Sequence, residues 1–152
     1  MNLKEELLNL IRTLNAAQLQ YAVCGGLAMT IHGFVRSTVD IDLLVPEGQL
    51  QQVLKTVETA GFWIPSGRMP FKAKTPVAMD IYRVSKAQGT ELISLDLIIV
   101  SEGLQKVWES REFYEVDTVI CPVVSRSGLI QMKTIAGRPQ DLVDIQRLTE
   151  GE

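Results

Sequence analysis

Two short runs of residues decide the fold that this sequence predicts: CGGL at residues 24–27 and RSTVDIDL at residues 36–43. The apolar run 21–24 predicts a short strand, and the pair Gly25 and Gly26 predicts a sharp turn directly after it. Residues Leu27–His32 then predict a short helix. A glycine pair at such a turn lets the backbone approach a ligand closely, and the free N–H groups that open the following helix suit a phosphate.

The second run predicts a strand over Thr38–Val45 that carries two carboxylates on one side. Alternate residues of a strand face the same way, so Asp40 and Asp42 project together, about 7 Å apart at the backbone. If extended geometry reaches back to Arg36, its side chain and that of Thr38 lie on the same side. Two like charges on one face repel each other, and folding alone would favour uncharged residues there. A divalent cation bound by the hard carboxylate oxygens would remove the repulsion, which predicts a metal site.

The composition is that of an ordinary globular protein, and we expect a single domain over residues 1–152. Of these residues, 46% are hydrophobic and 22% are charged, and a chain of this length buries enough surface to fold without disulfides. The net charge of −3 argues against a general nucleic-acid binder. Cys24 and Cys121 are far apart in apolar surroundings and fit two reduced thiols. Residues 1–14 lack the apolar run of a signal peptide or membrane span, so we expect a cytoplasmic protein with no membrane partner.

The remaining apolar patterns mix helices and strands without strict alternation. Amphipathic spacing and capping residues predict helices over 2–15, 47–60 and 101–110, from Ser125 or Ser127 to Ala136, and from Pro139 onward. Extended segments are predicted at 62–64, 71–73, 77–84, 92–100, 113–116 and 119–124, with hairpins among the first three. This mixture indicates an α+β fold in which helices pack on one face of a mixed β-sheet.

The two runs together resemble the signature of the polymerase-beta-like nucleotidyltransferases. That signature is a Gly-Gly or Gly-Ser turn, a short spacer, and then Asp-hydrophobic-Asp-hydrophobic; here residues 27–39 form the spacer before Asp40. The extension Arg36-x-Thr38-x-Asp40 is similar to the branch that contains the minimal nucleotidyltransferases and the toxins of abortive-infection systems. The resemblance implies transfer of a nucleoside monophosphate from a nucleoside triphosphate to an acceptor. It also implies two Mg²⁺ ions, with Mn²⁺ as an alternative, bound by Asp40 and Asp42.

The resemblance further implies a third carboxylate, on a neighbouring strand. Asp96 fits best, because it lies inside the strongly apolar segment 92–100, where an ionised group needs a partner. By resemblance, Asp96 would help to hold the catalytic metal and take the acceptor proton. An internal ion pair with Arg36 or Lys133 is the structural alternative, and Asp80 competes for the catalytic role.

A second match lies near the C-terminus, in residues 133–145. It is similar to the late motif of the abortive-infection nucleotidyltransferases, which has a helical lysine and an aspartate near the start of the next helix. By resemblance, Lys133 contacts the nucleotide, and Asp141 or Asp144 supports the site. Lys133 lies on an apolar helix stripe, from which a lysine either extends to solvent or reaches a buried anion. Asp141 has a structural alternative, because the helix dipole favours a carboxylate in the first turn.

The sequence therefore predicts a catalytic and metal-binding set and a nucleotide-binding set. The first set is Asp40, Asp42 and Asp96, and the second is Gly25, Gly26, Arg36, Thr38, Lys133 and Asp141. A surface salt bridge of Arg36 and plain strand propensity of Thr38 are the structural alternatives. The acceptor stays open between a protein hydroxyl, a tRNA and a small molecule. A helical partner protein, as in toxin–antitoxin pairs, or a homodimer could complete the site, and a catalytically weak nucleotide-binding or partner-binding subunit is the alternative function.

Overall fold

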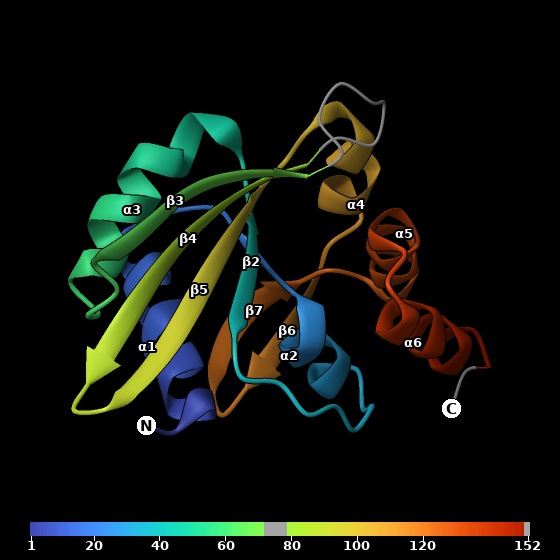
Figure 1. Cartoon of the computed structure of the whole chain (residues 1–152), viewed down its shortest axis with the longest axis horizontal. Coiled ribbons are helices and arrows are strands. Elements are labelled where there is room, and N and C mark those ends of the chain that lie inside the picture. The colour runs from blue at the N-terminus through green and yellow to red at the C-terminus, as the bar shows by residue number, and fades with distance from the viewer. Residues whose placement is uncertain (72–78, 151–152) are drawn as a thin grey trace.

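A seven-stranded mixed sheet forms the centre of the computed structural model, which describes residues 1–71 and 79–150 (Figure 1). Its strands are β1 (Ala22–Cys24), β2 (Ile41–Val45), β3 (Ile64–Phe71), β4 (Met79–Gln88), β5 (Glu91–Ile99), β6 (Glu112–Val116) and β7 (Val119–Val123). They lie in the order β3-β4-β5-β2-β1-β7-β6. The pairs β2–β5 and β1–β7 are parallel and the other neighbours are antiparallel. The predicted α+β class with a mixed sheet is confirmed.

The helices lie in two groups around this sheet. They are α1 (Leu3–Ala16), α2 (Gly25–Ile31), α3 (Leu50–Glu58), α4 (Gln105–Glu109), α5 (Arg126–Ala136) and α6 (Pro139–Glu150). Strands β3 to β5 cross in front of α1 and α3 in Figure 1. Helices α5 and α6 pack against each other and lie on the side of β2 away from α1 and α3 in this view. The predicted helices 47–60 and 101–110 each begin as a short 3₁₀ turn, Glu47–Gln49 and Glu102–Leu104. Within the described part of the chain, no helix is both long and apolar enough to span a membrane.

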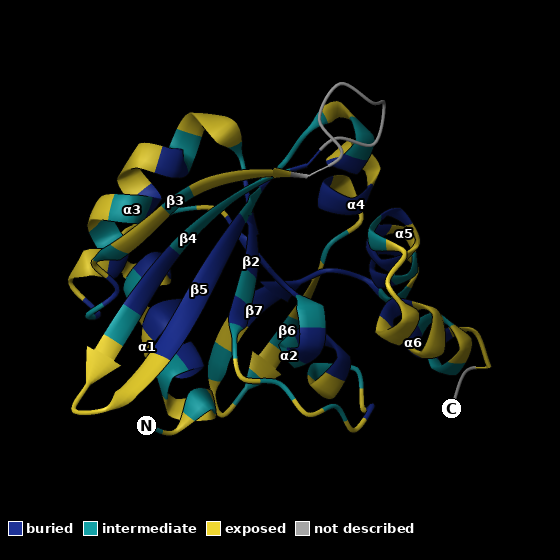
Figure 2. Cartoon of the chain, viewed as in Figure 1, coloured by how far each residue is buried: buried dark blue, intermediate teal, exposed yellow. Residues whose placement is uncertain are grey.

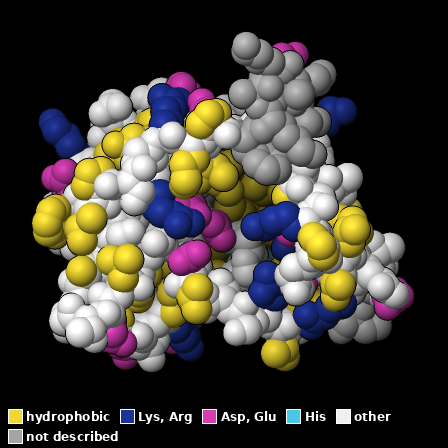
Figure 3. All heavy atoms as spheres, viewed as in Figure 1, with side chains coloured by type: hydrophobic (Ala, Val, Ile, Leu, Met, Phe, Trp, Pro, Cys, Tyr) yellow, Lys and Arg dark blue, Asp and Glu magenta, His cyan; other side chains and the backbone are white. Residues whose placement is uncertain are grey.

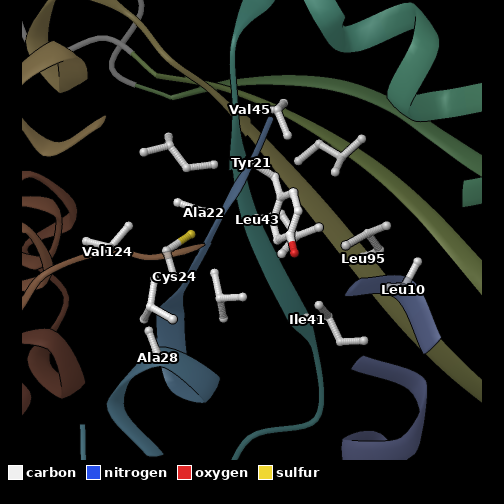
Figure 4. Close-up of a cluster of buried hydrophobic side chains, with 14 of the residues drawn as sticks. Leu10, Tyr21, Ala22, Cys24, Ala28, Ile41, Leu43, Val45, Leu95 and Val124 are labelled. Atoms are coloured by element: carbon white, nitrogen blue, oxygen red, sulfur yellow. The ribbon is translucent and has the colours of Figure 1, made fainter. Parts of the chain in front are cut away.

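The apolar core lies between the sheet and helix α1. Ile41, Leu43 and Leu95 are fully buried, and Figure 4 shows them beside Leu10 of α1. Figure 2 shows the same burial along the middle of β5 and β2. Because side chains alternate along a strand, the residues between these, Asp42 among them, face the opposite side of the sheet.

Strand β2 begins three residues later than predicted, at Ile41 instead of Thr38. Its pairing with β5 begins at Ile41, opposite Leu95, and its pairing with β1 begins only at Asp42, opposite Cys24. The chain over 34–40 is irregular, and the Thr38 hydroxyl donates to the carbonyl of Asp40 at 3.2 Å. Residues 36–40 therefore reach the site from a loop, and the expectation that they extend the strand is wrong.

Two other predicted boundaries also differ. The glycine pair does not form a separate turn, because Gly25 is already the first residue of α2. The predicted extended segments 62–64 and 71–73 give way to the single strand β3, and β4 runs on to Gln88. Proline is tolerated in β3 because this strand lies at the edge of the sheet, and its register shifts between Pro65 and Gly67. The parts of these predictions at 72–73 and 77–78 lie outside the described residues.

Both ends of α5 and the start of α6 lie where the sequence predicts them. Of the two candidate caps, Ser125 is the one used, because its hydroxyl accepts a hydrogen bond from the Gly128 N–H at 3.1 Å. Gly137 ends α5 in the left-handed conformation, with φ 65°, and Pro139 opens α6. This short connection fixes how α6 returns against α5.

We predict that Gly137→Ala lowers the free energy of unfolding by about 1 kcal/mol, because an L-residue is strained at positive φ. The added methyl group has room, with 3.7 Å to the nearest carbonyl oxygen, so strain is the dominant effect. Urea unfolding monitored by circular dichroism measures the change. Gly48→Ala is the control, since Gly48 also has open space but no positive φ; an equal loss in both variants would contradict the explanation.

Candidate active site

Three carboxylates from two strands and a loop come together on the face of the sheet opposite the core. Asp42 on β2 lies directly opposite Asp96 on the parallel strand β5. Asp40 immediately precedes β2, and its charge acts on Asp42. All three line one cavity. The structure therefore brings together the three carboxylates of the predicted catalytic set.

Asp80, the competing candidate for the third carboxylate, lies elsewhere. It pairs with Pro70 across β3 and β4, and its carboxylate accepts from Arg68 at 3.2 Å. Asp80 is not among the residues that line the cavity. Asp96 is thus the carboxylate that is placed beside Asp42.

Gly25 and Gly26 have no room for a side chain, because Asp42 and Thr38 lie against them. Gly25 has a φ of 67°, and a Cβ there would collide with the carboxylate of Asp42. A Cβ on Gly26 would lie 2.8 Å from the Cβ of Thr38. The pair allows the start of α2 to lie close against both β2 and the 34–40 loop, and both glycines line the cavity.

The Asp42 carboxylate is destabilised in its ionised form. Burial, and after it the negative charges of Asp96 and Asp40, raise its pKa from 3.8 to about 7. The positive charges of Arg138 and Arg83 oppose this shift. A carboxylate that holds a proton near neutral pH gains most from a bound cation, because the cation removes the repulsion that burial intensifies.

Basic side chains form the opposite wall of the cavity. Lys133 on α5 is 7% exposed and lies 2.9 Å from the carboxylate of Asp144 on α6 and 3.7 Å from that of Asp141. Arg36, from the 34–40 loop, bonds the same Asp144 oxygen through its Nε at 3.2 Å. Lys133 therefore reaches buried anions rather than solvent, and the Arg36 salt bridge is made to a fully buried carboxylate.

Arg138 completes this wall. Its side chain bonds both oxygens of Asp141, at 2.7 and 3.2 Å, and its backbone N–H donates to the same carboxylate at 3.1 Å. The last bond is half of a capping box, in which the side chain of the third helical residue accepts from the backbone N–H of the residue that precedes the helix. Burial alone would raise the pKa of Asp141, but the hydrogen bonds and charge of Arg138 hold it below the ordinary value. The pKa of Asp144 is likewise lowered against the effect of burial, chiefly by its hydrogen bond from Lys133.

Two adjoining cavities occupy the space between the walls. The polar one has a volume of about 330 Å³ and includes all the predicted nucleotide-binding residues except Asp141. The apolar one, of about 190 Å³, shares Gly25, Asp42, Asp96, Lys133 and Arg138 with it and also reaches Asp141. Its apolar lining is Met79, Ile81, Ile98, Leu129, Met132 and Ala136. Figure 3 shows the hollow, with acidic side chains over the strands and basic ones over α5 and α6.

The charges of the two walls have opposite signs. With every group ionised, the described residues of the sheet wall bring three carboxylates and one guanidinium, that of Arg83. The helix wall and its loop have three cations, Arg36, Lys133 and Arg138, against the two carboxylates of Asp141 and Asp144. A ligand that is cationic on one side and anionic on the other fits this arrangement.

Sequence reasoning missed two residues of the site. Arg83 bonds both oxygens of Asp96, at 2.7 and 2.9 Å, so Asp96 does have an ion-pair partner, but it is neither Arg36 nor Lys133. The available signal was that the predicted strand 77–84 carries two charged residues among apolar ones, Asp80 and Arg83, of which only Asp80 was considered for the site. Arg138 lies between the end of α5 and Pro139, where no residue pattern predicts a role in the site.

We call Asp40, Asp42 and Asp96 the acidic cluster. Their carboxylate oxygens suit a hard divalent cation, but in this structure not all of them are free to bind one. The residues that the structure describes include no group of three acidic, histidine or cysteine side chains placed to hold a metal together. Asp40 and Asp42 offer carboxylate oxygens toward the cavity, whereas both oxygens of Asp96 are engaged by Arg83. A cation therefore fits at Asp40 and Asp42, and Asp96 could join only if its bonds to Arg83 changed.

Carboxylates on adjacent strands beside a Gly-Gly pair at a helix start are the arrangement expected of a nucleotidyltransferase. Comparison with known proteins places the chain in the same class. The family described as "Nucleotidyltransferase of unknown function (DUF6036)" matches residues 1–149. The chain belongs to this nucleotidyltransferase family. No curated protein matches the sequence.

Several solved structures share the fold. A protein of Thermotoga maritima assigned to the nucleotidyltransferases has a TM-score of 0.63 at 14% identity, over 100% of this chain and 97% of that one. The lincosamide antibiotic adenylyltransferase LnuA, solved with lincomycin bound, has a TM-score of 0.62 at 14% identity, over 95% of each chain. ANT(2″)-Ia in complex with adenylyl-2″-tobramycin has a TM-score of 0.58 at 15% identity, over 95% of this chain and 87% of that one.

We predict that Asp42→Asn stabilises the metal-free protein increasingly as the pH rises from 4 to 8. Between 3.8 and about 7 the folded protein keeps a proton on Asp42 that the unfolded chain loses. Stability is therefore lost over this range and stays reduced above it. Removing the ionisable group should recover about 4 kcal/mol at pH 8 and little at pH 4. Urea unfolding at each pH in EDTA measures the difference. With Asp80→Asn as the exposed control, a flat pH dependence for Asp42→Asn would contradict the raised pKa.

Proposed function

We propose that this protein uses a divalent metal, Mg²⁺ or Mn²⁺, to transfer a nucleoside monophosphate from a nucleoside triphosphate to a hydroxyl of a small-molecule acceptor. The proposal rests on one observation: the carboxylates of the sheet wall and the cations of the helix wall line the same cavity. A metal–polyphosphate complex has the matching charges, positive toward Asp40 and Asp42 and negative toward Lys133 and Arg138. No single simple ion would satisfy both walls.

The residues divide the work according to their positions. Asp40 and Asp42 would hold the metal, which supplies positive charge to the phosphoryl oxygens in such reactions. Lys133, Arg138 and Arg36 would face the phosphates and hold the triphosphate in line. The acceptor oxygen attacks the α-phosphorus, the bond to the bridging β-phosphate oxygen breaks, and pyrophosphate leaves. Asp96 would take the proton of the acceptor hydroxyl. Positioning and charge stabilisation then supply most of the catalysis.

The apolar cavity supports a bound ring next to the phosphates. It adjoins the polar cavity along five shared residues and reaches Asp141, and the rest of its lining is apolar side chains of β4, β5 and α5. Small-molecule sites combine such an apolar lining with a few polar groups. We assign this space to the nucleoside. A small-molecule acceptor is supported by the lincomycin and tobramycin compounds in the two antibiotic-modifying neighbours; protein and tRNA acceptors are the alternatives.

The competing proposal is a nucleotide-binding or partner-binding subunit with little turnover. It is favoured by one observation: both oxygens of Asp96, the carboxylate that would accept the proton, are bonded by Arg83. In that case a helical partner, as in a toxin–antitoxin pair, or a second copy of the chain would complete the site. Metal-dependent nucleotide binding without pyrophosphate release, for every acceptor offered, would select this alternative.

We predict that each nucleoside triphosphate that binds does so only with Mg²⁺ or Mn²⁺, and that the double substitution Asp40→Asn and Asp42→Asn weakens binding at least tenfold, about 1.4 kcal/mol or more. Isothermal titration calorimetry measures the affinity. Pyrophosphate release and the mass of the product, with aminoglycoside, lincosamide, tRNA and protein acceptors in turn, then identify the reaction. Glu47→Gln is the control, because Glu47 lies outside both cavities. Equal affinity with and without metal would refute the proposal.

We predict that Ala136→Phe weakens nucleotide binding by roughly tenfold while the melting temperature stays within a few degrees of wild type. Ala136 is half-buried and lines the apolar cavity, so a phenyl ring there fills the space of the nucleoside without replacing a core side chain. Thr134→Phe places the same ring on the exposed side of α5 and serves as the matched control. Unchanged affinity for Ala136→Phe would show that the nucleoside binds elsewhere.

A further inference from the structure

Arg83 contacts two of the three carboxylates of the acidic cluster. It lies on β4 directly opposite Asp96 on β5. Its Nε and Nη2 atoms donate to the two oxygens of Asp96 at 2.7 and 2.9 Å, and Nη2 lies 4.0 Å from an oxygen of Asp40. A bidentate pair of this kind is among the strongest that a guanidinium forms with a carboxylate.

The position of this pair separates it from an ordinary cross-strand ion pair. The Asp96 side chain is only 13% exposed, and both residues line the polar cavity. The guanidinium therefore faces the place where the carboxylates would meet a cation. Its charge also acts on Asp42, which lies beside Asp96 on the neighbouring strand.

We propose that Arg83 is a positioning residue that occupies Asp96 in the metal-free protein and competes with the divalent cation for the acidic cluster. This inference rests on the proposed function, because it assumes that Asp40 and Asp42 bind a metal. The cluster would take its first cation through Asp40 and Asp42 alone. Asp96 becomes available to a cation or to the acceptor proton only when its bonds to the guanidinium are given up.

The expected effect of removing Arg83 follows from its charge. Replacing Arg83 with glutamine removes a positive charge close to the cation site and frees both oxygens of Asp96. Both changes favour a bound cation, since opposite charges a few ångströms apart attract strongly in a partly buried site. A purely structural ion pair predicts the opposite, because its loss would loosen the two strands and weaken any site built on them.

The test is the affinity of the metal-free full chain for Mn²⁺, measured by titration calorimetry and by electron paramagnetic resonance of free Mn²⁺. We predict that Arg83→Gln binds Mn²⁺ about tenfold more tightly than wild type. Arg83→Lys keeps the charge but loses the two-point contact, so it should fall between the two. Arg68→Gln is the matched control, because Arg68 is also paired with a carboxylate on β4 but lies outside both cavities. Its affinity should equal that of wild type.

A second comparison tests whether the gain passes through Asp96. In the background of Asp96→Asn, Arg83→Gln should tighten Mn²⁺ binding much less, because the freed carboxylate is missing. If Arg83→Gln fails to fold, Arg83→Lys gives the same sign of change. Wild-type binding with equal or weaker affinity in both Arg83 variants would overturn this inference and leave the proposed function standing. An absence of Mn²⁺ binding in wild type and in both variants would overturn both.

Discussion

Repulsion among three carboxylates on one face of the sheet is the constraint to which the rest of the site responds. The parallel pairing of β2 with β5 places Asp42 directly opposite Asp96, and the loop brings Asp40 beside them. Like charges on neighbouring strands destabilise a sheet, and burial makes this worse. Burial first, and then the charges of Asp96 and Asp40, raise the pKa of Asp42, which expresses that cost.

The neighbouring sequence is arranged around this cost. Gly25 leaves space for the Asp42 carboxylate where any other residue would collide with it. Arg83 satisfies both oxygens of Asp96 and lies near Asp40. The buried thiol of Cys24, opposite Asp42 on β1, stays neutral because burial first, and then the charges of Asp42 and Asp96, raise its pKa. The metal-free protein thus keeps a concentrated negative charge by local compensation.

The sequence predicted those parts of the structure that depend on neighbours along the chain. The helix over 2–15, the strand over 92–100, both ends of α5 and the start of α6 follow from periodicity and capping. The structure places them within about two residues of the predicted positions. The parts that depend on pairing between distant segments were not accessible. The start of β2 is set by where its pairing with β5 begins, and the partner of Asp96 is set by the register of β4, which no local pattern of residues specifies.

The same difference explains why the candidate site was predicted better as a list than as a geometry. Asp40, Asp42, Asp96 and Lys133 were chosen from motif spacing, and the structure gathers them around one cavity. Arg36 and Thr38 also reach this cavity, but from a loop and not from the predicted strand. That loop is attached to the C-terminal helices by the bond from Arg36 to Asp144.

Asp144 connects the two walls of the site. It is fully buried, and it accepts from Lys133, from Arg36 and from Gln140 of its own helix. Because Arg36 lies four residues before Asp40, the bond that fixes α6 against α5 also fixes the loop that leads into the acidic cluster. Asp144 therefore links the helix wall to the loop that leads into the acidic cluster. A ligand that draws Lys133 or Arg36 away from Asp144 would leave the Asp144 charge buried without full compensation. Breaking a buried ion pair in this way costs about 3–5 kcal/mol. The polyphosphate of the proposed function would therefore bind to Lys133 and Arg36, which line the cavity, while they remain paired with Asp144. The cation excess of the helix wall, three against two, leaves charge for such a ligand without breaking the pairs that hold the wall together.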